Sequence, residues 1–206
     1  MSSLNASKFD KKSLYQQRDF EYVISVIYTC YNKMLQNYSV IENNENKIRN
    51  RLYKDFLKPV KVKEGLSIDK WIFHPEVPEI DDSYHEYGRT DIMLYLSDEY
   101  LKSENAYYVI ECKRIDGGKT LNDAYIQNGM NRFIGEKYPV YNNKAGMLGF
   151  VVKSININDN SVENLKLKKN NVISNANFEY ISQHTTSSGK DFCIYHLMLD
   201  FSSKIK

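Results

Sequence analysis

The sequence predicts a single α/β domain, built in three layers from a mixed central β-sheet with helices on both sides. Its 206 residues suit one domain of ordinary size, and a hydrophobic content of 42% is enough for a packed core. Stretches with helical periodicity also alternate along the chain with short apolar stretches of strand length. This alternation is typical of proteins in which helices cover a sheet.

Two helices are expected before the first strand, after a polar tail at 1–12. Residues 13–38 carry apolar side chains at the i, i+3, i+4, i+7 spacing of a helix that buries one face. A second helix should run from about Ile41 or Asn44 to Leu57. Pro59 bounds it, because a proline disfavours helical backbone at the residue before it.

One acidic residue of this second helix falls among its apolar positions. The apolar stripe consists of Ile41, Ile48, Leu52 and Phe56. At about 100° per residue, Glu45 lies inside that stripe, three residues before Ile48. A glutamate on the buried face of a helix is unusual, and metal binding would explain it.

The middle of the chain predicts three strands. Residues 70–79 alternate apolar and polar side chains, and their two prolines are typical of an edge strand or an irregular strand. After a polar loop at 80–87, Gly88 precedes a second apolar strand, which runs to the turn-like stretch 97–105. Residues 106–114, AYYVIECKR, then form an apolar strand that is buried on both faces.

The last part of the chain predicts two helices and three strands. Helical periodicity covers 119–137, and 144–152 is a buried strand rich in small residues. An Asn-rich cluster begins a helix at 158–170, although its apolar face is weak. Residues 177–184 and 191–201 are expected to be the final two strands, joined by a Ser-Ser-Gly turn.

The strand at 106–114 ends in a charged pair. Because side chains alternate between the faces of a strand, Glu111 and Lys113 share one face and Cys112 takes the other. A hairpin through the turn at 97–105 would place Asp91 opposite Glu111. Like charges at that spacing repel, and a divalent cation between them reverses the sign of the interaction. The pattern therefore predicts a Mg²⁺ or Mn²⁺ site.

These residues resemble the signature of the PD-(D/E)XK nuclease superfamily, which includes restriction endonucleases and phage-defence nucleases. Gly88-x-x-Asp91 corresponds to its first acidic motif, and Glu111-Cys112-Lys113 corresponds to its (D/E)xK motif. Thr90 stands where the family pattern has proline. The family core runs helix, three strands, helix, strand, which is the order predicted within 44–152.

The resemblance implies a fold and a site. The chain would be one restriction-endonuclease-like domain, 1–206, with an added N-terminal helix at 13–38, a catalytic core at 41–152 and a C-terminal helix and strands at 153–206. The metal ligands would be Glu45, Asp91, Glu111 and the backbone carbonyl of Cys112. Lys113 would assist the attacking water, and the cofactor would be Mg²⁺ or Mn²⁺.

The resemblance also implies a reaction and partners. The protein would be a DNA endonuclease in restriction or anti-phage defence, and it would act as a homodimer or within a larger defence complex. In the helix at 119–137, Gln127, Arg132 and Lys137 are candidates for contact with nucleic acid.

Other interpretations of the same residues stay open. The chain could be a nuclease-like domain that binds nucleic acid or a partner protein without cutting, or a structural domain without metal. Glu111 and Lys113 could form an ordinary ion pair, and Glu45 could simply favour the dipole at a helix start. His184 and His196 lie on the two final strands and are interpreted as structural residues with satisfied hydrogen bonds.

Composition and motifs also limit which other functional classes the sequence can belong to. A formal net charge of +2 gives no indication of nucleic acid, so any basic patch must be local. The cysteines number three and lack metal-ligand spacing, which favours reduced thiols in a cytoplasmic protein. No apolar run reaches the roughly 18 residues of a membrane span. Neither a P-loop nor a GxGxxG pattern is present, so nucleotide cofactors are not indicated.

Overall fold

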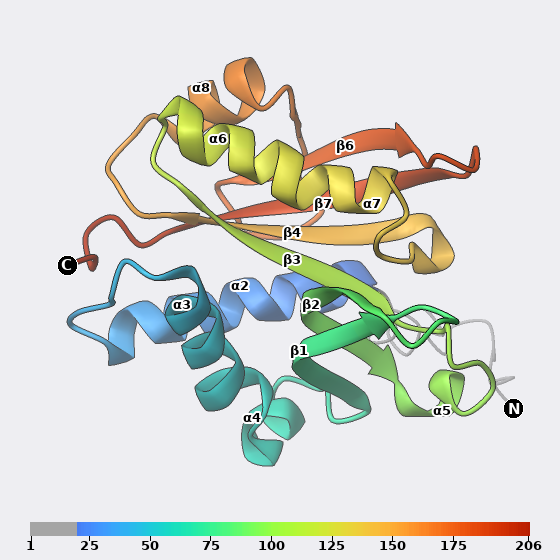
Figure 1. The fold of residues 1–206 in the computed structure, drawn as a ribbon. Coiled ribbons are helices and arrows are strands. Elements are labelled where there is room, and N and C mark those ends of the chain that lie inside the picture. The colour runs from blue at the N-terminus through green and yellow to red at the C-terminus, as the bar shows by residue number, and fades with distance from the viewer. Residues whose placement is uncertain (1–19) are drawn as a thin grey trace, which may run out of the picture.

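The computed structural model describes residues 20–206, which share one seven-stranded mixed sheet (Figure 1). The strands are β1 (Trp71–Ile80), β2 (Glu86–Leu96), β3 (Tyr108–Ile115), β4 (Lys144–Val151), β5 (Lys168–Lys169), β6 (Glu179–Thr185) and β7 (Asp191–Asp200). Their order across the sheet is β1-β2-β3-β4-β7-β6-β5. The β3–β4 and β4–β7 pairs are parallel and the others antiparallel. The predicted α/β class with a mixed sheet is confirmed.

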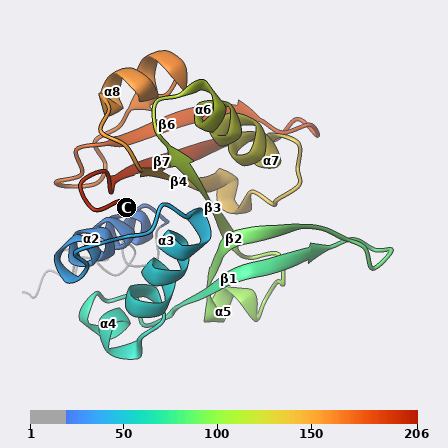
Figure 2. The same cartoon turned by 60° about the vertical axis from the view of Figure 1, so that its left-hand side comes forward.

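Helices lie on both sides of this sheet (Figures 1 and 2). The first group consists of α2 (Phe20–Asn37), α3 (Glu45–Leu52), the π-helical turn η2 (Tyr53–Leu57) and α4 (Val60–Gly65). The second group consists of α6 (Lys119–Tyr125), η3 (Ile126–Met130), α7 (Asn131–Ile134), α8 (Ile157–Asp159) and η5 (Asn160–Asn164). The N-terminal helix is confirmed from Phe20 onward, and 13–19 lie outside the described residues.

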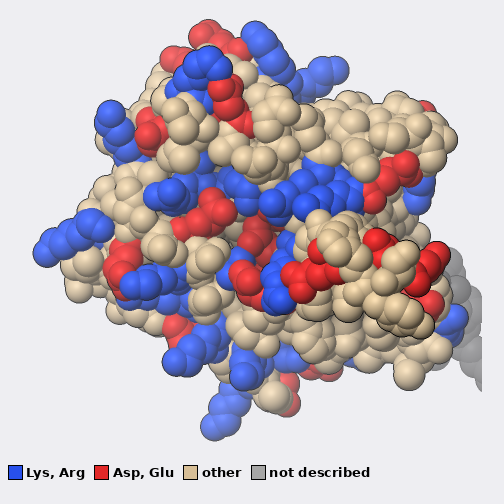
Figure 3. Space-filling view, viewed as in Figure 1, with Lys and Arg blue, Asp and Glu red and all other residues tan. Residues whose placement is uncertain are grey.

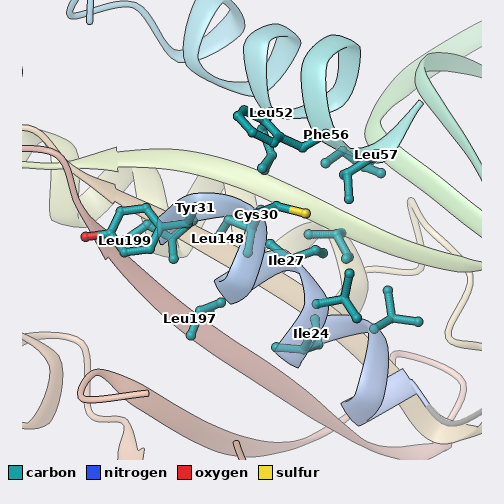
Figure 4. Close-up of a cluster of buried hydrophobic side chains, with 14 of the residues drawn as sticks. Ile24, Ile27, Cys30, Tyr31, Leu52, Phe56, Leu57, Leu148, Leu197 and Leu199 are labelled. Carbon is teal, nitrogen blue, oxygen red and sulfur yellow. The ribbon is translucent and has the colours of Figure 1, made fainter. Parts of the chain in front are cut away.

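Two hydrophobic clusters, one on each face, show why the sheet lies in the middle. Alternate residues of β3 divide between them: Ile110 and Cys112 join the cluster beneath α2 and α3, whereas Val109 and Ile115 join the cluster beneath α6 and α7. Figure 4 shows the first cluster, in which side chains of α2 meet those of η2, β4 and β7. Burial of apolar area on both faces is the main stabilising term of this architecture.

The strand predictions hold better than the predicted ends of helices. β1 is an edge strand, as its prolines predicted. The predicted loop at 80–87 is shorter, since β2 already begins at Glu86, and a short helix, α5 (Ser97–Tyr100), occupies part of the predicted turn. The helix predicted at 158–170 is only the short α8–η5 segment, because its apolar face is too weak to extend it.

The helix predicted at 119–137 ends early, at Ile134. The Gly135 amide donates to the Asn131 carbonyl, and Glu136 then adopts a positive φ of 57°. Left-handed backbone closes a helix, so Lys137 lies outside it.

No helix among residues 20–206 combines the length and apolar character that crossing a membrane requires.

Gly146 on β4 lies where α2 crosses the sheet, and it offers a test of this packing. A Cβ atom there would come within 2.8 Å of Ile110 Cγ1 and 3.1 Å of Phe20 Cζ. We expect Gly146→Val to destabilise the protein by about 1–3 kcal/mol, because overpacking forces the helix away from the sheet. Urea unfolding followed by circular dichroism measures this loss.

The matched control is Gly65→Ala, where a Cβ atom would meet nothing within 4 Å. It should change the free energy of unfolding by no more than about 0.5 kcal/mol. Equal losses in both variants would contradict the packing of α2 on β4.

Candidate active site

All four side chains predicted to form a site come together near the C-terminal end of β3. Lys113 Nζ lies 2.7 Å from Glu111 Oε1, 3.2 Å from Glu45 Oε1 and 3.6 Å from Asp91 Oδ2. It also donates a 2.7 Å hydrogen bond to the Cys112 carbonyl. One ammonium group is thus surrounded by oxygens from α3, β2 and β3.

The strand places two of these charges in the interior. Glu111 and Lys113 lie on the β3 face that packs against α6–α7, between Val109 and Ile115. Glu111 is fully buried, and Lys113 has a relative exposure of 8%. Gly129 of η3 passes over them; a Cβ atom there would lie 3.5 Å from Lys113 Cγ. Charges in this position are costly unless they are paired.

Glu45 reaches the site from the start of α3. The Asn44 side chain caps the helix by accepting from the Lys47 amide, so Glu45 is the first helical residue. Its Oε2 accepts a 2.9 Å hydrogen bond from the Arg114 amide of β3. The side chain is 27% exposed, so Glu45 is less buried than its stripe position predicted. The reason is that the helix begins there, at the rim of the site.

Asp91 occupies the point at which β2 and β3 separate. The antiparallel ladder has the predicted register and ends at Ile92↔Ile110. Beyond it, the Cys112 amide donates a 2.8 Å hydrogen bond to Asp91 Oδ2 instead of to a backbone carbonyl of β2. The carboxylate therefore replaces the next step of the ladder and is fixed against β3.

Arg49 of α3 is the main site residue that the sequence did not reveal. Its side chain is almost fully buried and forms ion pairs with Asp91 Oδ1 and with Glu76 of β1. Its Nε and Nη2 also donate to the Asn50 side chain, at 3.2 and 3.1 Å. The available signal was spacing, because Arg49 follows Glu45 by one helical turn and so shares its face.

Arg132 joins the cluster from α7. Its Nη1 donates to Glu111 Oε1 at 2.7 Å and to the Tyr138 hydroxyl at 2.6 Å. The other two nucleic-acid candidates lie outside the cluster. Gln127 is exposed and accepts from the Asn131 side chain, and Lys137, beyond the end of α7, extends along Gly88 of β2.

The pKa values of Glu111 and Lys113 are both raised in the site. Burial, together with Asp91, raises the pKa of Glu111 to about 8, although Lys113 and Arg132 act in the opposite direction. Burial also disfavours the charge of Lys113, but the surrounding carboxylates Glu111, Asp91 and Glu45 outweigh this and raise its pKa. Lys113 therefore stays charged at neutral pH.

The donor set suits a hard divalent cation, since every ligand candidate is an oxygen atom. Glu111 Oε2 is buried and has no hydrogen-bond partner among residues 20–206. Within the same residues, however, no three Asp, Glu, His or Cys side chains are arranged to hold a metal ion together. Lys113 and Arg49 lie between the carboxylates and neutralise them, so a metal ion would compete with these internal cations.

Comparisons of the chain with protein-family models, with curated proteins and with solved structures give no match. The protein is thus placed by its fold as an α/β domain with a mixed sheet, and its site is defined by the residues alone.

The Arg49–Asp91 pair yields a stability prediction. Arg49→Ala should lower the free energy of unfolding by about 3–5 kcal/mol, because it removes the cation that pairs with buried Asp91 Oδ1 and leaves only the longer contact with Lys113. Adding Asp91→Asn to this variant should recover part of the loss, since the uncompensated charge is then gone. Urea unfolding at pH 7 measures both. A loss below about 1 kcal/mol for Arg49→Ala would show that the pair does not hold Asp91 in place.

The raised pKa of Glu111 yields a pH prediction. Its value of about 8 in the folded protein exceeds the ordinary 4.5, so its contribution to stability is fully present below pH 4.5. That contribution should decline as pH rises toward 8. Unfolding measured from pH 4.5 to 9 should therefore show wild type losing stability relative to Glu111→Gln, which cannot ionise. Parallel curves for the two proteins would contradict the shift.

Proposed function

We propose that this protein is a metal-dependent nuclease that hydrolyses phosphodiester bonds in DNA. The observation that carries the proposal is the convergence of Glu45, Asp91, Glu111 and the Cys112 carbonyl around Lys113. The PD-(D/E)XK resemblance implies these acidic ligands and a lysine beside them.

The order of elements gives further support. Apart from the short elements η2, α4, α5 and η4, the chain from α3 to β4 runs helix, three strands, helix, strand, through β1, β2, β3 and the α6–α7 segment. This is the order of a restriction-endonuclease-like core, which we propose as the finer fold assignment.

The resemblance also supplies the biological part of the proposal. We propose a role in restriction or anti-phage defence, assembly as a homodimer or in a defence complex, and a cytoplasmic location.

Each residue of the cluster has a role in this reaction. Asp91, Glu111, the Cys112 carbonyl and Glu45 would hold Mg²⁺ or Mn²⁺, which activates water and stabilises charge on the phosphate. Lys113 would donate hydrogen bonds to the attacking water or to the developing negative charge. Because its pKa is raised, Lys113 acts as a charged donor and not as a base.

The surface charge is compatible with a nucleic-acid substrate. Figure 3 shows Lys and Arg side chains in a band across the middle of this face, with Asp and Glu side chains gathered below it. Arg132 contacts the cluster directly and Lys137 lies against Gly88 of β2, and both are candidates for contact with the DNA backbone. Gln127 is an exposed residue that contacts Asn131.

A second candidate function is favoured by one observation. Arg49, Lys113 and Arg132 already neutralise the carboxylates of the site. A domain whose acidic cluster is compensated in this way could bind nucleic acid or a partner protein without cutting it.

Cleavage assays distinguish the two candidates. We expect the wild-type protein to cut plasmid or single-stranded DNA when Mg²⁺ or Mn²⁺ is present and to stop when EDTA is added. Lys113→Ala and Asp91→Asn should lower the rate by about 100-fold or more, because each removes a group that acts on the reacting phosphate. Gels of fluorescent substrates measure the rates, and circular dichroism shows that each variant is folded.

Lys119→Ala serves as the control, since Lys119 is 87% exposed and pairs only with Asp123 among residues 20–206. Its rate should equal that of wild type. DNA binding without cleavage, unchanged by Asp91→Asn, would support the non-cutting domain. Calorimetry with Mn²⁺ provides the separate test of metal: heat that Asp91→Asn abolishes supports the site, and its absence contradicts it.

A further inference from the structure

Within residues 20–206, one guanidinium nitrogen makes the hydrogen bonds that hold Arg132 at the site. Nη1 makes both of its hydrogen bonds, to Glu111 Oε1 and to the Tyr138 hydroxyl. Nε and Nη2 have no hydrogen-bond partner among residues 20–206, and neither atom is buried. The side chain is 29% exposed. One edge of the guanidinium is therefore bound to the protein, and the opposite edge faces solvent.

The free edge has a defined chemistry. Nε–H and Nη2–H point the same way in the planar guanidinium group, so together they form a two-pronged donor. Such a donor matches two oxygens of one carboxylate or one phosphate. A lysine at this position would carry the same charge but could not present two parallel donors.

The guanidinium group is also fixed in its orientation. Tyr138 is almost fully buried, and its ring centre lies 5.5 Å from the Arg132 guanidinium carbon. The Tyr138 hydroxyl, which accepts from Arg132, donates in turn to the Arg89 carbonyl of β2. A donor that is already oriented loses less conformational entropy when a ligand binds.

The position of this donor defines what it binds. Glu111 Oε1 accepts from both Arg132 Nη1 and Lys113 Nζ, each at 2.7 Å. An oxyanion on the free edge of Arg132 would thus lie across the guanidinium group from Glu111, which the proposed catalytic lysine also contacts. We propose that Nε–H and Nη2–H of Arg132 bind two non-bridging oxygens of a substrate phosphodiester at the edge of the active site, with Tyr138 and Glu111 as positioning residues. This inference rests on the proposed nuclease function for the identity of its ligand.

A direct test uses inorganic phosphate and needs no cleavage. In the ¹⁵N-labelled protein, the Nε–H resonance of Arg132 is identified by its loss in Arg132→Lys. Titration with phosphate in the absence of metal should shift this resonance to saturation. Tyr138→Phe removes the accepting hydroxyl while keeping the ring, and it should weaken phosphate binding. Phosphate that shifts other arginine resonances and leaves Arg132 unmoved would overturn the proposal.

Binding of DNA gives the second test. A fluorescein-labelled oligonucleotide is titrated with protein in Ca²⁺, and anisotropy is recorded at several salt concentrations. Arg132→Ala should weaken binding by about tenfold to a hundredfold and reduce the salt slope by about one ion. Arg132→Lys should restore the slope but not the affinity. Lys119→Ala should keep the wild-type affinity. Full affinity in Arg132→Lys would overturn the two-pronged contact.

The two proposals can fail separately. If wild type does not cut DNA but phosphate still shifts the Arg132 resonance, the nuclease function fails and the oxyanion site stands. If cleavage depends on Lys113 but Arg132→Lys binds and cuts as wild type does, the nuclease function stands and the role of Arg132 is overturned.

Discussion

The ammonium group of Lys113 is the interaction on which this part of the fold depends. It contacts carboxylates from three elements, Glu45 of α3, Asp91 of β2 and Glu111 of β3. These elements meet where β2 and β3 cease to pair, so backbone hydrogen bonds do not join them there. Because Asp91, Glu111 and Lys113 are buried, each attraction among them is stronger than it would be in water, and each missing partner is more costly.

The same charges that hold the fold also limit the chemistry. Arg49 fixes Asp91 from the side of α3, and Arg132 holds Glu111 from the side of α7. Lys113 now contacts the carboxylate oxygens that a divalent cation would bind. The cation would therefore have to displace Lys113 from some of them. The internal cations therefore orient the carboxylates in advance and at the same time weaken their affinity for metal. Buried Glu111 Oε2, which has no partner among residues 20–206, is the ligand for which no internal cation competes directly.

Local rules of the chain predict much of this arrangement. Alternation along β3 predicts that Glu111 and Lys113 share a face, and the position of the turn predicts the β2–β3 register. Arg49 could not be predicted in this way, because an arginine in a helix is ordinarily exposed and only the fold provides its buried partners. The prediction that the helix extends to Lys137 is wrong. A non-glycine residue, Glu136, adopts the left-handed conformation that ends the helix before Lys137. Such conformations are rarely visible in a sequence.

A second buried polar network shows by contrast why the chemistry is assigned to the charged cluster. His196 of β7 is bound on both ring nitrogens, by the Tyr125 hydroxyl and by Ser182 Oγ, each at 2.8 Å. His184 contacts the same Ser182 Oγ at 2.7 Å. Burial lowers the pKa of His196 to about 3, so the ring stays neutral and is a poor base for activating Ser182. This network is neutral and satisfied, which suits a structural role. The Lys113 cluster instead keeps separated charges and an unpartnered buried oxygen, which are the features that a charged substrate or a metal ion can use.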